Sequence, residues 1–169
     1  MDLDRVQRRP EFAAIGITVP RVLLQTPADN GLNPTNTSIE VMNVDGTGVT
    51  TLFKKEGFSA FNAVWSPQGD RIALSVGRYF RPPGGPAAPI AIINADGSGY
   101  KDVVDDGVNN GFPSWSPDGK KIVFASNRAA YAGKLSAADE ERLKLDKQYF
   151  MDLYIMDADG SNVRRLTDV

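Results

Sequence analysis

The sequence offers few side chains for catalytic chemistry, because none of its 169 residues is histidine or cysteine. Ser-His-Asp catalysis, Cys-His nucleophiles and histidine-ligated metal sites are therefore excluded within this chain. General acid–base catalysis would fall to carboxylates, and the candidates are Asp105-Asp106, Asp139-Glu140-Glu141 and Asp152. All of these read more simply as charges on loops or on a helix surface. We expect no catalytic residue, no metal and no cofactor in this chain.

One acidic segment superficially resembles the start of a calcium loop: Asp157-Ala158-Asp159-Gly160-Ser161-Asn162. It lacks the twelve-residue frame and the terminal glutamate that such a loop uses. Two sibling segments begin with asparagine: Asn43-Val44-Asp45-Gly46-Thr47-Gly48 and Asn94-Ala95-Asp96-Gly97-Ser98-Gly99. A tight turn explains all three copies, because aspartate can bond to its own backbone and glycine accepts φ > 0. We predict three hairpin turns and no calcium site.

A second repeated segment alternates with these turns, Trp65-Ser66-Pro67-Gln68-Gly69 and Trp115-Ser116-Pro117-Asp118-Gly119, 50 residues apart. Apolar, β-branched runs follow both copies and flank the Asp-Gly turns, which is typical of strands. Four strands are expected in each repeat: one at Trp-Ser-Pro, one after it, and two joined by the Asp-Gly turn. The strands that flank these turns are predicted at 39–43, 49–54, 90–94, 100–104, 153–157 and 163–167. Four antiparallel strands repeated every 40–50 residues or so indicate an all-β fold of β-propeller blades.

The segments Trp-Ser-Pro-Asp-Gly, Asp-Ala-Asp-Gly-Ser-Asn and Arg165-Leu166-Thr167 closely resemble the TolB-type (WD40-like) β-propeller repeat. The resemblance covers residues 38–169 well and continues weakly from Pro20. Gln68 departs from it by replacing the usual aspartate, which should weaken the self-cap of that turn. The resemblance implies a bacterial, envelope-associated protein that binds a peptide or protein partner, located in the periplasm or outside the cell. Because Trp65 and Trp115 occupy the same repeat position, we expect them to pack between blades and not to stack on a ligand.

The repeats divide the chain into about three blades. We expect an N-terminal segment at 1–19, in which Phe12–Val19 could supply a first strand, and a partial first blade at 20–56. The second blade is expected at 57–106 and the third at 107–169. Since propellers usually have four to eight blades, we expect either a piece of a longer propeller or two copies that complete a six-bladed ring. A propeller that gates a separate serine peptidase or amidohydrolase domain is the alternative function.

Three long insertions, 26–37, 77–89 and 128–152, all follow the second strand of a repeat and precede the third. In a four-stranded antiparallel blade these connections share one rim with the connections between blades, while the tight turns lie on the other. The last insertion should contain a short helix near 136–149, because Ser136 and Asp139 form a capping-box-like start. Elaborated loops on a rigid scaffold often bind partners. The candidate partner-binding residues are Asn30, Asn33, Arg78, Tyr79, Arg81, Arg128, Tyr131 and Lys134.

Charge and hydropathy limit the other classes of partner. The 19 Lys and Arg residues and 21 Asp and Glu residues give a formal net charge of -2. No basic stripe is present, so we expect no nucleic-acid binding. No apolar run approaches the ~18 residues that a spanning helix needs, so we expect no membrane insertion. The first ten residues are charged and predict no secretory signal, although a mature secreted domain would look the same.

Overall fold

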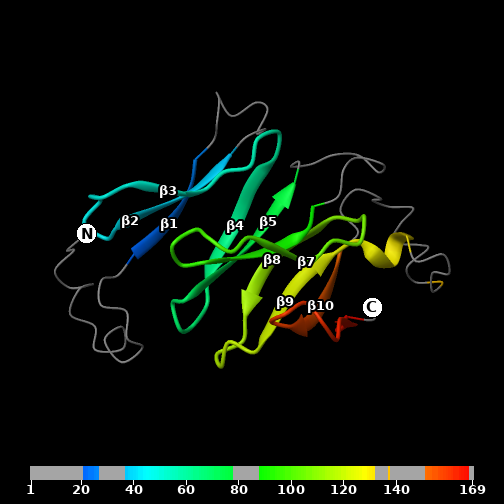
Figure 1. Ribbon diagram of the computed structural model, residues 1–169. Coiled ribbons are helices and arrows are strands. Elements are labelled where there is room, and N and C mark those ends of the chain that lie inside the picture. The colour runs from blue at the N-terminus through cyan, green and yellow to red at the C-terminus, as the bar shows by residue number, and fades with distance from the viewer. Residues whose placement is uncertain (1–20, 27–36, 78–87, 132–136, 138–150, 168–169) are drawn as a thin grey trace.

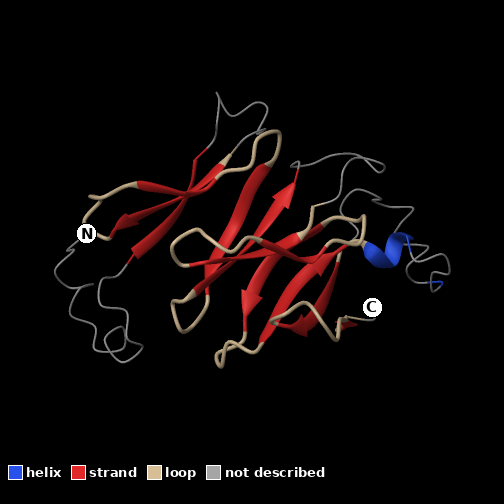
Figure 2. Cartoon of the chain, viewed as in Figure 1, coloured by secondary structure: helices blue, strands red, loops and turns tan. Residues whose placement is uncertain are grey.

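The computed structural model describes residues 21–26, 37–77, 88–131, 137 and 151–167. They form three antiparallel sheets that follow one another along the chain (Figure 1; Figure 2). The first sheet has the order β1-β2-β3, with strands Arg21–Thr26, Ser38–Asn43 and Thr50–Phe53. The second has the order β4-β5-β6-β7, with strands Ser59–Trp65, Arg71–Gly77, Ile90–Asn94 and Lys101–Val104. The third has the order β8-β9-β10-β11, with strands Asn110–Trp115, Lys121–Ser126, Asp152–Asp157 and Arg164–Arg165.

The prediction of an all-β chain built from four-stranded antiparallel blades is confirmed, and the strands flanking each Asp-Gly turn lie close to their predicted positions. A short 3-10 helix, η1, covers Arg128–Tyr131. The predicted strand at Phe12–Val19 lies outside the described residues. So does the predicted helix near 136–149, apart from Ala137, which is helical. None of the helices in the described part of the chain is long and apolar enough to cross a membrane.

Two details of the predicted strands were wrong. The Trp-Ser-Pro segment is not a strand throughout, because β4 and β8 end at the tryptophan and the residues that follow form the turn to the next strand. In that turn Gly69 N donates to Ser66 O at 2.9 Å, and Gly119 N donates to Ser116 O at 2.9 Å. The strand also begins well before the motif in the third sheet, because β8 starts at Asn110, five residues ahead of Trp115. Proline and glycine favour the turn over further strand pairing, because proline has no N–H to donate.

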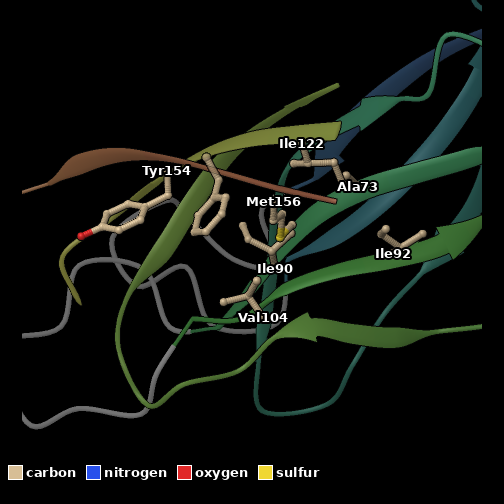
Figure 3. Close-up of a cluster of buried hydrophobic side chains, with 8 residues drawn as sticks. Ala73, Ile90, Ile92, Val104, Ile122, Tyr154 and Met156 are labelled. Carbon is tan, nitrogen blue, oxygen red and sulfur yellow. The ribbon is translucent and has the colours of Figure 1, made fainter. Parts of the chain in front are cut away.

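The second sheet is buried on both faces, which explains its continuous apolar strands. In β5, Ile72, Leu74 and Val76 pack toward the first sheet, while Ala73 between them packs toward the third. The neighbouring strand β6 alternates in the same way, because successive side chains of a strand point to opposite faces. Figure 3 shows the resulting core between the second and third sheets. Its members are Ala73, Ile90, Ile92, Val104, Ile122, Phe124, Tyr154 and Met156.

The hairpin turns also join neighbouring sheets, through their glycines. Gly97 lies so close to the first sheet that a Cβ on it would be 2.2 Å from Leu52 O. Gly160 stands in the same relation to the second sheet, with Val103 O 2.1 Å from such a Cβ. Both glycines have positive φ, at 86° and 94°. Only glycine satisfies the backbone conformation and the close approach together.

The two tryptophans lie between sheets, as the repeat predicted. Trp115 is partly buried against the core between the second and third sheets, and its Nε1 donates to Val64 O at 3.3 Å. The guanidinium of Arg71 lies over its ring at 4.9 Å. Trp65 packs in the equivalent way against the core between the first and second sheets. Their interpretation as inter-blade core residues is confirmed.

Candidate binding rim

The ends of the three long connections lie on one rim of the sheets. Thr37, which ends the connection from β1 to β2, donates its Oγ1 to Ala60 O at 2.8 Å and accepts from Ala60 N at 3.2 Å. Ala88, near the end of the β5–β6 connection, accepts from Asn110 N at 2.9 Å. In both cases the connection binds a residue of the first strand of the following sheet. The same rim is therefore rebuilt at each junction between sheets.

Asn109 joins the second connection to the third. It forms a bridge with Ala88, and on its other side its backbone pairs with Asn127, which follows β9. Asn127 N donates to Asn109 O at 3.1 Å, and Asn127 Oδ1 accepts from Asn109 N at 2.9 Å. The loop from β7 to β8 is thus held between the two insertions. The described ends of all three insertions are fixed to the sheet framework by hydrogen bonds.

Arg128 anchors the start of the longest connection. Its guanidinium is 2.9 Å from Asp106 Oδ2, and its Nη2 donates to Asn110 Oδ1 at 3.3 Å. The same group lies over two aromatic rings of the core, 4.7 Å from the Tyr154 centroid and 5.2 Å from that of Phe124. A half-buried arginine with a carboxylate partner and two ring faces is held in one place. Arg128 therefore ties the β7–β8 loop to the third sheet, as a structural clamp.

Asp152 anchors the other end of this connection and corrects an expectation. We interpreted it as a loop charge, but it is the first residue of β10 and its side chain is only 1% exposed. Its carboxylate lies 2.6 Å from Arg165 Nη2 and accepts from Thr167 Oγ1 at 2.9 Å. A carboxylate is rarely buried unless it is paired in this way. Burial at a strand start was not visible in the sequence, because the partners come from β11 and the residues after it.

Only part of the predicted site can be placed. Arg128 is described in full, and Tyr131 is described as the last backbone position of η1. Asn30, Asn33, Arg78, Tyr79, Arg81 and Lys134 lie outside the described residues. The structure therefore defines the base of the rim. The contacts that sequence reasoning missed are those of Asn109 and Asp152, which have no distinctive motif.

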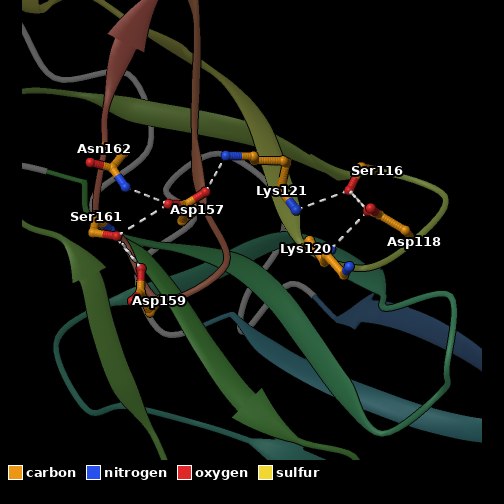
Figure 4. A network of polar contacts seen from close by, with 8 residues as sticks. All are labelled: Ser116, Asp118, Lys120, Lys121, Asp157, Asp159, Ser161 and Asn162. Atoms are coloured by element: carbon orange, nitrogen blue, oxygen red, sulfur yellow. Dashed lines mark hydrogen bonds and ion pairs between the residues drawn. The ribbon is translucent and has the colours of Figure 1, made fainter.

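The opposite rim carries the tight turns and a different polar network, drawn in Figure 4. In the third sheet, Asp159 Oδ1 accepts from Ser161 N at 2.9 Å and from Ser161 Oγ at 2.6 Å. Asp157 binds Lys121 and accepts from Asn162 Nδ2 at 2.6 Å. Both carboxylates thus bind protein donors, and among the described residues no group of three or more metal-ligating side chains occurs. The turn interpretation of this segment agrees with this geometry.

Gln68 does not cap its own turn, and its role is different from the expected one. Its Nε2 donates to Asp118 O in the equivalent turn of the third sheet, at 3.2 Å. The capping role in its own turn is taken over by Asp70, whose Oδ1 accepts from Ser66 Oγ at 2.7 Å. In the third sheet the equivalent serine, Ser116, donates to Asp118 at 2.6 Å. The substitution at position 68 therefore moves the cap by two residues and adds a bond between sheets.

These turn carboxylates predict acid sensitivity. Hydrogen bonds from the hydroxyl and backbone N–H of Ser98 hold the pKa of Asp96 below its ordinary value, and those of Thr47 and Ser161 do the same for Asp45 and Asp159. A lowered folded-state pKa means that the folded protein favours the ionised form. The free energy of unfolding should therefore stay constant above the ordinary aspartate pKa and fall as the pH drops below it. Urea denaturation between about pH 6 and pH 3 would measure this fall. Asp96→Asn should flatten it, and an unchanged acid slope would contradict the assignment.

Three successive antiparallel sheets, joined by close turns and by a hydrophobic core at each junction, define the described part of the chain as β-propeller blades. Among solved structures it is similar to TolB from Acinetobacter baumannii, at 19% identity and a TM-score of 0.59, over 97% of this chain and 35% of that one. A protein assigned as TolB from Agrobacterium tumefaciens matches at 23% identity and a TM-score of 0.57, over 92% of this chain and 52% of that one. A chain of a nidogen/laminin complex matches at 14% identity and a TM-score of 0.59, over 89% and 44%.

These likenesses establish the fold, a TolB-like arrangement of propeller blades. No protein-family model matches the sequence, and no curated protein sequence matches it. The chain spans between 35% and 52% of the length of the three solved structures named above. The activity and partners of a whole protein of this kind are therefore matters of proposal.

Proposed function

We propose that this chain is a non-catalytic scaffold that binds a protein or peptide on the rim formed by its three long connections. The observation that carries the proposal is the asymmetry between the two rims. One rim gathers the ends of the insertions at Thr37, Ala88 and Asn127 and ties them to the sheets. Among the described residues, the other rim has compact turns whose polar groups bind one another. A framework with variable loops on one side is the usual arrangement of a binding face.

The residues of these connections suit a polypeptide partner. The sequence places Asn30, Asn33, Arg78, Tyr79, Arg81, Tyr131 and Lys134 in them. Tyrosine and arginine are the residues most often found at the energetic centres of protein interfaces. One of the similar solved structures is itself a protein–protein complex, of nidogen and laminin. We assign the binding contacts to these side chains, and the role of Arg128 to holding the rim in place.

The resemblance of the repeat to TolB supports a location in the bacterial periplasm, which we include in the proposal. In that compartment, where disulfides are common, a chain without cysteine gains no stability from them. The proposed partner is then a secreted or envelope protein, or an extended segment of one.

The absence of cysteine allows a direct test of which rim binds. A peptide selected from a phage-displayed library on the immobilised full chain serves as the probe. Asp105→Cys places a photo-crosslinking group on the rim of the insertions, and Lys120→Cys is the matched control on the opposite rim; both positions are exposed. We expect Asp105→Cys to crosslink the peptide and Lys120→Cys not to. Crosslinking confined to Lys120→Cys, or a library that yields no binding peptide, would refute the proposal.

A further inference from the structure

The third sheet has one face that no other described sheet covers, and this face is built like a blade junction. Leu153 and Ile155 of β10 occupy the repeat positions of Ile39 and Val41 in the first sheet and of Ile90 and Ile92 in the second. Those four residues are between 0% and 9% exposed, because the following sheet covers them. Leu153 is 45% exposed. Its neighbours on this face are Val123 and Ala125 across the strand pair and Leu166 beyond β11. We call these residues, together with Leu153 and Ile155, the forward face.

Leu166 also belongs to the forward face, because it holds the position whose carbonyl is approached by a turn glycine at the other junctions. Gly97 approaches the carbonyl of Leu52, and Gly160 approaches that of Val103. Leu52 and Val103 each lie six positions after the turn glycine of their own sheet, Gly46 and Gly97. Leu166 holds the same position in the third sheet, six residues after Gly160. Leu52 and Val103 pack against the cores between sheets. Leu166 remains 43% exposed. The forward face therefore has the acceptor half of a junction: an apolar surface and a carbonyl at the position that a glycine turn approaches.

The donor half of the same junction lies at the other end of the described chain. Gly46 has φ 86°, equal to that of Gly97, but a Cβ on it would have nothing within 4 Å. Met42 and Glu40 hold the positions of residues that face the preceding sheet elsewhere, Ile93 and Ala91 in the second sheet. We call Glu40, Met42 and Gly46 the backward face of the first sheet. It has the features that the second and third sheets use to pack on the sheet before them.

We propose that the occupant of the forward face is the backward face of a second copy of this chain. The two faces match at the features they share with the two existing junctions: the apolar surface of the forward face and the turn glycine of the backward face. They are also complementary in charge, because Arg164 pairs with Ile155 across β10 and β11 and so lies on the forward face, opposite in sign to Glu40. Such a head-to-tail contact closes when the rotation returns to the start.

The pairing predicts a discrete dimer. Light scattering over a concentration series of the full chain should give a mass that rises to a plateau at twice 18.3 kDa. A mass that stays at the monomer value at every concentration would overturn the second copy as occupant. A mass that passes the dimer value without a plateau would overturn the closed pair. Peptide binding to the rim does not enter this measurement, so the proposal does not depend on the proposed function.

Matched variants separate the contact from general loss of folding. Leu153→Glu places a charge in the proposed contact and should weaken the dimer by at least about a hundredfold. Lys120→Glu is the control, because Lys120 is exposed in the turn between β8 and β9 and belongs to neither face. Arg164→Glu should weaken the dimer, and adding Glu40→Arg should restore it. Circular dichroism checks that each variant is folded. A folded Leu153→Glu protein with unchanged dimerisation, or no recovery in the double charge reversal, would overturn the proposal.

Discussion

Replacing Gly97 with alanine is expected to lower the free energy of unfolding by about 2–5 kcal/mol. The first part of the cost is conformational, because φ at this position is 86° and an L-residue there is strained. The second part is steric, because the new Cβ would be 2.2 Å from Leu52 O. A backbone carbonyl cannot rotate away as a side chain can. Relief therefore requires the first and second sheets to move apart, which opens the core between them.

Gly107→Ala is the matched control for the conformational part. Gly107 has φ 79°, and a Cβ there would have no atom within 4 Å. It should lose only about 1–2 kcal/mol. Urea denaturation of both variants under the same conditions measures the two losses of unfolding free energy. The excess loss in Gly97→Ala is the steric cost of the close approach between the turn and Leu52 O. Equal losses for the two variants would show that this contact does not constrain the packing of the sheets.

The repeats made most of the fold predictable, because a blade is specified locally. Each Asp-Gly turn combines a residue that bonds its own backbone with one that accepts positive φ, and apolar strands flank it. The strand pairs around the turns at Asp45, Asp96 and Asp159 therefore appear where the sequence indicated them. The exact ends of the Trp-Ser-Pro strands were less predictable. Serine and proline can end a strand or begin a turn, and only the pairing of Ser66 with Arg71 decides between these.

The interactions that the sequence did not reveal join residues far apart in the chain. Asp152 is buried because Arg165 and Thr167 come from the far side of a hairpin. Gln68 bridges to Asp118, 50 positions away, through a bond that no local motif announces. The sequence likewise showed that Gly97 needs a positive φ, but not that Leu52 O lies against it. A single sequence contains the local turn chemistry and leaves these long-range partners open.

The candidate rim was predictable in position and only partly in its residues. The order of antiparallel strands in a blade placed the three insertions on one side, and the contacts of Thr37, Ala88 and Asn127 bring their ends together. Motif reasoning found Arg128 but not Asn109, whose backbone joins two of the connections. Backbone pairing is independent of side-chain type, so the sequence carried no sign of it.

Phe124→Ala is expected to cost about 3–5 kcal/mol of unfolding free energy. Phe124 is fully buried, stacks on Tyr154 with ring centroids 5.9 Å apart, and belongs to the core between the second and third sheets. Removing the ring would leave a cavity that two rigid sheets cannot close. It would also remove one of the two rings beneath the Arg128 guanidinium. The substitution should therefore weaken both the junction and the anchor of the rim.

Phe112→Ala, in the neighbouring strand β8, is the matched control. It deletes the same ring from a position that is 59% exposed and has φ 54°. Little apolar surface leaves water there on folding, so its effect should stay within about 0.5 kcal/mol. Thermal and urea denaturation of both variants measure the contrast. If Phe124→Ala proved as mild as Phe112→Ala, the core between these sheets would not be what holds them together. In that case the turns and the Arg128 clamp would carry the junction, and removing Asp106 as the partner of Arg128 should then cost more than removing the ring.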